Sequence, residues 1–119
     1  MTTKASSGNF SSEIYNYVTA VRTGGPIIAN IAITNSSYVV TGSNILSTVN
    51  GGHVKIIGSN FFSNTQVLVK SGSIKNATII NYTSNSELQV QLPASNAGVN
   101  LLYVVNYDGK FAANTIGYV

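Results

Sequence analysis

Cysteine is absent from this chain of 119 residues. Disulfide bonds and thiolate metal sites are therefore excluded, and with them the class of small secreted domains that disulfides hold together. The first residues, MTTKASSGNFSSE, contain no apolar stretch of the length found in secretory signals, and no run approaches the length of a membrane span. We therefore expect a protein that is made in the cytoplasm without a signal peptide, does not enter a membrane, and reaches the outside only by lysis or from a larger precursor.

Charged residues are also scarce. They make up 8% of the chain, with six cations, three anions and a formal net charge of +3. Proteins that bind nucleic acids gather Lys and Arg on one face, because their affinity comes from neutralising several phosphates at once. The cations of this chain are instead spread along the sequence, which predicts no nucleic-acid partner: Lys4, Arg22, Lys55, Lys70, Lys75 and Lys110.

The stretch GGHVKIIGSNF, residues 51–61, is the most suggestive of chemistry, because it combines three glycines, a lysine and the only histidine. A phosphate-binding loop needs its lysine at the start of a helix, but Lys55 lies inside an alternating β pattern. A metal site at His53 would need further ligands, and the chain has no second histidine and only three carboxylates. No serine lies in a G-x-S-x-G motif. We therefore expect no catalytic residue, no metal, no cofactor and no enzymatic activity.

We interpret this stretch as structural. It predicts a glycine turn, then a strand with two side chains in the core, then a bend of glycine and asparagine before a phenylalanine that closes the end of the core. In order along the chain, these residues are Gly51 with Gly52, Val54 with Ile56, Gly58 with Asn60, and Phe61.

Short alternating segments recur between turn signals from Ile27 onward. In ELQVQL (87–92), Leu88, Val90 and Leu92 are predicted to face inward and the polar residues to face water. Seven or eight such strands predict an all-β sandwich over residues 26–119. The predicted strands cover residues 27–33, 38–40, 53–57, 66–70, 77–83, 87–93, 100–106 and 111–119.

Asp108 and Gly109 stand between the last two predicted strands. An Asp-Gly pair is typical of two-residue hairpin loops, in which a type I′ turn needs positive φ at both central residues. We therefore expect these strands to pair as a hairpin with a type I′ turn.

An ordered series of these residues resembles the IPT/TIG domains, immunoglobulin-like folds found in receptors, Rel-type transcription factors, glucan-acting enzymes and phage surface proteins. The resemblance covers roughly residues 26–119 and implies an immunoglobulin-like β-sandwich of about seven strands. Nucleic-acid-binding members rely on Arg-rich loops, which this chain lacks. The series consists of Gly51, Gly52, Val54, Ile56, Gly58, Asn60, Phe61, Ser84, Leu88, Val90, Pro93, Gly98, Val104, Asn106, Asp108, Gly109 and Tyr118.

Residues 1–25 form a predicted N-terminal arm that ends at a breaker cluster before Pro26. Its apolar residues fit both helical and strand spacing, with β-branched and aromatic content favouring the strand. The entropy cost of ordering the arm exceeds what its few apolar side chains return, so its backbone would have to pair with a neighbour by strand addition. Otherwise it stays a mobile tail, and a strand folded back on its own sandwich is a further alternative. The predicted partner-binding residues are Phe10, Ile14, Tyr15, Tyr17, Val18 and Val21.

These features favour a structural protein of a virion, because such a protein assembles in the host cytoplasm and leaves by lysis. We expect a decoration, cement, neck or tail-associated protein of a phage that attaches through its arm and displays the sandwich. Its expected partners are other capsid or tail proteins and copies of itself.

The alternative is a carbohydrate-binding or adhesive module of a larger surface protein, with cell-surface glycans as partners. Seven tyrosines and many amides could stack on sugars and hydrogen-bond to them. We expect most of these tyrosines to lie in the core instead.

Overall fold

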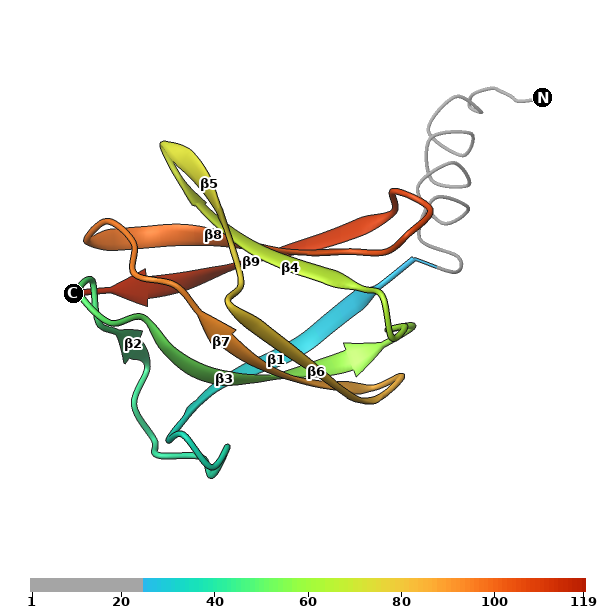
Figure 1. Cartoon of the computed structure of the whole chain (residues 1–119), viewed down its shortest axis with the longest axis horizontal. Helices are drawn as coiled ribbons and strands as arrows, with labels where there is room; N and C mark the ends of the chain where they lie inside the picture. Colours follow the sequence, from blue (N-terminus) through green and yellow to red (C-terminus); the bar gives the residue numbers. More distant parts are fainter. Residues whose placement is uncertain (1–24) are drawn as a thin grey trace, which may run out of the picture.

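The computed structural model describes residues 25–119 as two β-sheets packed face to face, which confirms the predicted all-β sandwich (Figure 1). The first sheet has the order β1 (Ile27–Thr34), β3 (Gly52–Ser59), β7 (Glu87–Leu92) and β6 (Ile79–Ser84). The second sheet has the order β2 (Ile45–Leu46), β9 (Phe111–Tyr118), β8 (Gly98–Val105), β4 (Gln66–Ser71) and β5 (Ser73–Asn76). All pairs are antiparallel except β2 with β9.

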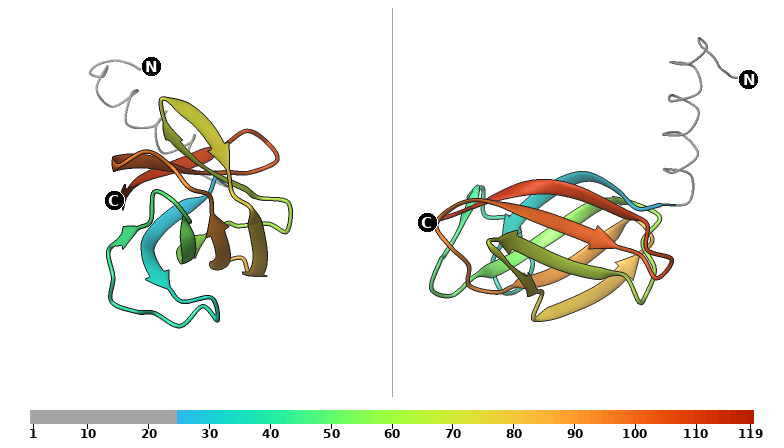
Figure 2. Two further views of the ribbon diagram at one scale, coloured as in Figure 1. Left: turned by 60° about the vertical axis from the view of Figure 1, so that its left-hand side comes forward. Right: turned by 90° about the horizontal axis from the view of Figure 1, so that it is seen from above.

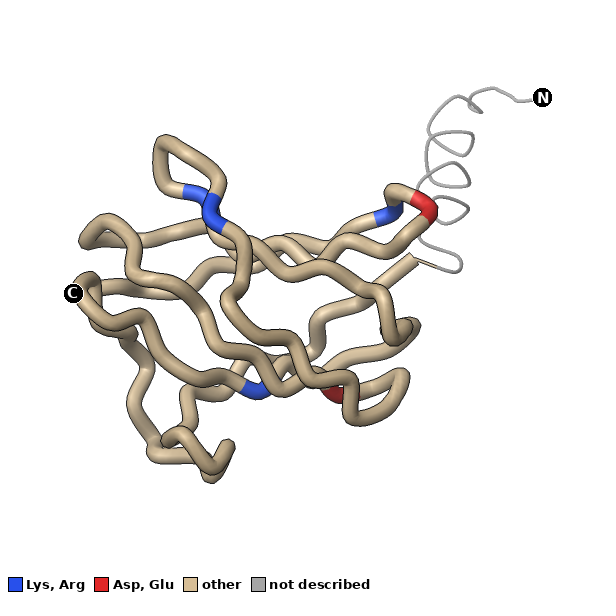
Figure 3. The backbone as a smooth tube through the Cα atoms, in the orientation of Figure 1, with Lys and Arg blue, Asp and Glu red and all other residues tan. Residues whose placement is uncertain are grey.

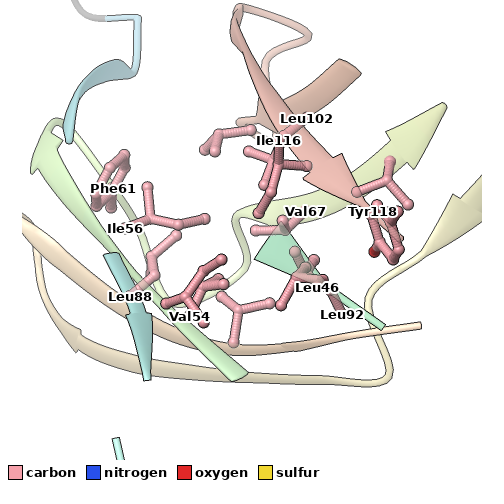
Figure 4. Close-up of a cluster of buried hydrophobic side chains, with 14 residues drawn as sticks. Leu46, Val54, Ile56, Phe61, Val67, Leu88, Leu92, Leu102, Ile116 and Tyr118 are labelled. Carbon is pink, nitrogen blue, oxygen red and sulfur yellow. The ribbon is translucent and has the colours of Figure 1, made fainter. Parts of the chain in front are cut away.

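The core lies between the two sheets and is built by the period-two alternation of the central strands (Figure 4). Leu88, Val90 and Leu92 of β7 are fully buried, as predicted, and the side chains between them are partly exposed. The whole core cluster consists of Ile33, Leu46, Val54, Ile56, Phe61, Val67, Val69, Leu88, Val90, Leu92, Leu102, Val104, Ile116 and Tyr118.

Residues 38–40 do not form the predicted strand. Their only ladder contact is a single bridge between Thr34 and Val40. The Asn35 side chain holds this segment in a turn, because its Oδ1 accepts hydrogen bonds from the backbone N–H groups of Ser37 and Val39. Such local bonds favour a turn over a sheet ladder.

The last two strands pair as the predicted hairpin, but the type I′ turn is wrong. Gly109 has a φ of +86°, and Asp108 does not have positive φ. Val105 pairs with Phe111, and the Gly109 N–H donates to the Asn106 carbonyl at 2.9 Å, so the loop is longer than two residues. In such loops only the residue after a type I turn needs positive φ, and glycine supplies it.

Gly58 has a different role from the predicted bend. It lies inside β3, and a Cβ added there would come within 1.7 Å of the Ile27 carbonyl oxygen. Gly58 is therefore needed for the close approach of β1 to β3. The chain leaves β3 at Asn60, whose φ of +62° agrees with the prediction, and Phe61 is buried at the end of the core.

Tyr118 is the last core residue and is 2% exposed. Its hydroxyl donates a hydrogen bond of 2.8 Å to the Pro93 carbonyl, which joins β9 to the segment after β7. Burial raises the pKa of Tyr118 to about 12, because ionisation would place a charge in the core. The folded protein therefore holds this proton at a pH where the unfolded chain releases it.

This raised pKa predicts a loss of stability in alkali. Between about pH 10 and pH 12 the unfolded chain loses the Tyr118 proton and the folded chain keeps it, so the free energy of unfolding falls as pH rises. The slope from this one group is at most about 1.4 kcal/mol per pH unit. Urea unfolding of the wild type and of Tyr118→Phe across this range measures the difference. Parallel pH profiles for the two proteins would contradict the prediction.

Candidate functional site

The stretch 51–61 consists of β3 and the residues directly before and after it. Val54 and Ile56 are buried in the core, whereas Lys55 lies on the opposite face of β3. His53 is half-buried at the start of β3, where the Tyr38 ring meets it edge-on at 5.3 Å between ring centroids. Within residues 25–119, no group of three His, Cys, Asp or Glu side chains gathers where a metal ion could bind.

The outer face of the first sheet is mostly polar. Lys55, Gln89 and Asn81 are neighbours in register across β3, β7 and β6. Tyr38 adopts a φ of +61° and reaches this face from the loop after β1. Burial raises the pKa of Tyr38, and a hydrogen bond with the Asn81 side chain opposes that shift. This face therefore suits contact with water or with hydrogen-bonding ligands.

The outer face of the second sheet is apolar. We call Leu68, Ile74, Tyr103, Val105 and Phe111 the outer apolar face; together with Lys70 they line an open groove of about 310 Å³. The side chains of Ile74 and Phe111 are 62% and 61% exposed. Exposed apolar patches of this kind mark interaction sites in soluble proteins.

Strand β8 explains why the sequence builds this face. Its segment NLLYVVN is apolar on both sides of the strand, so Leu102 and Val104 fill the core and Tyr103 and Val105 point outward. Leu68 of β4 is the register partner of Tyr103, and Phe111 of β9 is the partner of Val105. The Tyr103 and Phe111 rings lie 5.8 Å apart. Three neighbouring strands thus place apolar side chains on one surface.

The described chain begins at the border of this face. Pro26, Ile27 and Ile28 line a hollow of about 300 Å³ together with residues 111–113 of β9. The start of β1 and the β8–β9 turn lie at the same end of the molecule in all views (Figure 2). Among the described residues, β9 has β8 on one side, and on its other side only Gly117 and Tyr118 pair, with β2. The N-terminal half of β9 therefore has an open edge beside the start of the chain.

A buried amide fixes this end of the molecule. Asn106 is 3% exposed, and its Oδ1 accepts a hydrogen bond of 2.7 Å from the Thr65 hydroxyl. Its Nδ2 donates to the Asn60 carbonyl at 2.8 Å, and the Asn60 Nδ2 donates to the Gly25 carbonyl at 2.9 Å. These bonds connect the β8–β9 hairpin, the β3–β4 connection and the point where the N-terminal segment joins the sandwich.

The six predicted partner-binding residues lie outside the described residues, so that call stays a prediction: Phe10, Ile14, Tyr15, Tyr17, Val18 and Val21. The outer apolar face is not among the surfaces that the alternating patterns predicted. The signal that points to it is the run of apolar residues from Leu101 to Val105, because a strand with only one buried face alternates instead.

The tyrosines differ from the prediction that most lie in the core. Of the five among residues 25–119, only Tyr118 is buried, whereas Tyr82 and Tyr107 are 43% and 70% exposed. Tyr107 meets Phe62 at 5.5 Å between ring centroids, next to the β8–β9 turn. Aromatic side chains are enriched on strands because they pack on sheet surfaces, and the outer surface of a sheet satisfies this as well as the core.

The charged side chains of the described residues are few and are spread over both sheets (Figure 3). Lys70 and Lys75 lie on the β4–β5 hairpin, Lys55 lies on β3, and Lys110 lies near Asp108 in the β8–β9 turn. No helix within residues 25–119 is long and apolar enough to cross a bilayer.

Comparisons with known proteins agree with this architecture. Residues 39–118 match the model of the IPT/TIG domain family, and the match begins after β1. The solution structure of the TIG domain from human nuclear factor of activated T-cells, cytoplasmic 4, is similar, with a TM-score of 0.56 and 18% sequence identity. That likeness covers 80% of this chain and 86% of the other, and it shows the fold alone. A search of curated proteins gave no match. The predicted boundary at residues 25 and 26 stays a prediction.

Replacing Asn106 with alanine tests the role of the buried amide. Asn106→Ala leaves the Thr65 hydroxyl and the Asn60 carbonyl without their partner, and we expect the free energy of unfolding to fall by about 2 to 3 kcal/mol. Urea unfolding measures the loss. The matched control is Asn114→Ala, an exposed position that is expected to change stability by less than about 0.5 kcal/mol. Equal losses in the two variants would refute the role.

Proposed function

The chain belongs to the IPT/TIG domain family, and from that premise we propose that it is a structural, non-catalytic protein of a virion. Domains of this family are generally non-catalytic interaction modules. The chain would act as a decoration, cement, neck or tail-associated protein of a phage. Residues 1–25 would attach it to capsid or tail proteins and to copies of itself, and the sandwich would be displayed outward.

One observation carries this proposal. The N-terminal segment joins the sandwich at Gly25, beside the open edge of β9 and the outer apolar face. A segment that is predicted to form a strand, next to an open edge and an apolar sheet surface, matches the parts that strand addition between subunits uses. Residues 51–61 and the polar face of the first sheet offer binding groups but no nucleophile with a base beside it.

A second candidate is a carbohydrate-binding or adhesive module. The exposed aromatic pair Phe62 and Tyr107 favours it, because both side chains are open to solvent, at 41% and 70% exposed, and sit next to a turn. An aromatic ring with an exposed face and a polar tip suits stacking on a sugar ring. Under this candidate, binding depends on the loops of the sandwich and not on the N-terminal segment.

Deletion of residues 1–24 separates the two candidates. The deletion keeps Gly25, whose carbonyl accepts the hydrogen bond from Asn60, so the sandwich keeps its anchor. We expect the full chain to co-purify from phage-infected cells with large assemblies and the shortened chain to lose this association. Pull-down followed by mass spectrometry measures both.

The control for the second candidate is Tyr107→Ala, tested with the full chain on a glycan array. Glycan binding that survives the deletion and is lost in Tyr107→Ala would replace the virion proposal with the adhesive one. A full chain that remains a monomer in the lysate and associates with no assembly would also overturn the virion proposal.

A further inference from the structure

We propose that, in the free protein, the outer apolar face is the docking site for residues 10–21 of the same chain. The inference goes beyond the proposed function, since it concerns the isolated molecule and not the assembly that the molecule joins. It assigns a ligand to a surface that the family match does not explain.

The face has the chemistry of a protein contact left open. Leu68, Tyr103 and Val105 form its half-buried floor, and Ile74 and Phe111 stand at its two sides with most of their surface exposed. A groove of about 310 Å³ runs between them. Covering this apolar surface would remove it from water, which favours docking.

The segment that would cover it is attached at the border of the face. Pro26 and Phe111 line the same hollow, and hydrogen bonding of the Gly25 carbonyl to Asn60 holds the attachment point in place. Val21 lies five residues before Pro26, so extended chain reaches about 17 Å from that point. A tether this short gives an effective concentration in the millimolar range, which favours docking within one molecule over docking between molecules.

The composition of the segment matches the face. Residues 10–21, FSSEIYNYVTAV, contain a single charged side chain, Glu13, among several apolar and aromatic ones. The only charged side chain that lines the groove is Lys70, which has the opposite sign. The pairing is thus apolar against apolar with one complementary pair of charges. The face of the first sheet also offers a lysine, Lys55, but its register neighbours Gln89 and Asn81 are polar.

The absence of cysteine makes a direct test simple, because one introduced cysteine carries a spin label at a single place. We would label Ser12→Cys in the full chain and record amide signals by NMR. Docking predicts loss of most of the signal intensity at Leu68, Ile74 and Tyr103, with signals of β3 and β7 retained. Unchanged intensity at the face would overturn the proposal.

A mixed sample distinguishes the same chain from a neighbouring copy. Labelled chains without the NMR isotope are combined with unlabelled chains that carry it. Docking within one molecule predicts no intensity loss in this sample. If the signals of the face lose as much intensity in the mixed sample as in the spin-labelled chain, the segment docks on a neighbouring copy. That result would refute docking within the chain.

Two surface variants check that the face itself is responsible. Ile74→Lys adds a charge to the groove at an exposed position, and we expect it to restore the intensity of the face signals in the spin-labelled chain. Val49→Lys, at a residue that is 79% exposed in the turn after β2, should leave the loss unchanged. If neither or both variants restore the intensity, the proposal fails. If docking within the chain is refuted, the proposed function is unaffected, because co-purification with an assembly tests that function separately.

Discussion

The hydrogen bonds of the buried Asn106 side chain are the interaction on which the arrangement of the N-terminal segment and the sandwich depends. One amide accepts from Thr65 and donates to the carbonyl of Asn60, and Asn60 in turn binds the carbonyl of Gly25. A buried amide with its partners in place fixes geometry, since any displacement leaves a polar group without a hydrogen bond. The network therefore determines where the N-terminal segment joins the sandwich, which is beside Phe111 and the open edge of β9.

The two outer faces of the sandwich follow from different alternations along the strands. On the first sheet, polar residues occupy most of the outward positions, including all three of β7. On the second sheet, β8 carries apolar residues on both sides, so one set closes the core with Leu102 and the other, with Tyr103, is left outside. A sandwich with a closed core and an apolar outer face on its second sheet is suited to binding. The proposed attachment to a virion and the docking of residues 10–21 both use this asymmetry.

The sequence was sufficient to predict those strands in which a single hydrophobic period dominates. ELQVQL alternates without exception, and its three apolar residues are buried as predicted. The sequence pattern did not predict the structure where a local hydrogen bond or the strand register determines it. At Asn35, for example, side-chain hydrogen bonds hold residues 38–40 in a turn instead of a strand. Strand β2 has only two residues, which is too short to show a period, and strand β5 has a single apolar residue. Alternation also shows which side chains share a face without showing whether anything covers it, which is why the outer apolar face and the exposed tyrosines were missed.

The central claim is that residues 10–21 cover the outer apolar face in the free protein. Hydroxyl-radical footprinting of the full chain and of the chain lacking residues 1–24 tests this claim most directly. Mass spectrometry of the labelled protein reports how far each side chain is open to solvent. Removal of the segment is expected to raise labelling of Ile74, Tyr103 and Phe111 several-fold, with labelling of Val49 and Tyr107 unchanged. Equal labelling of the outer apolar face in the two proteins would show that the face is open in the full chain and would contradict the claim.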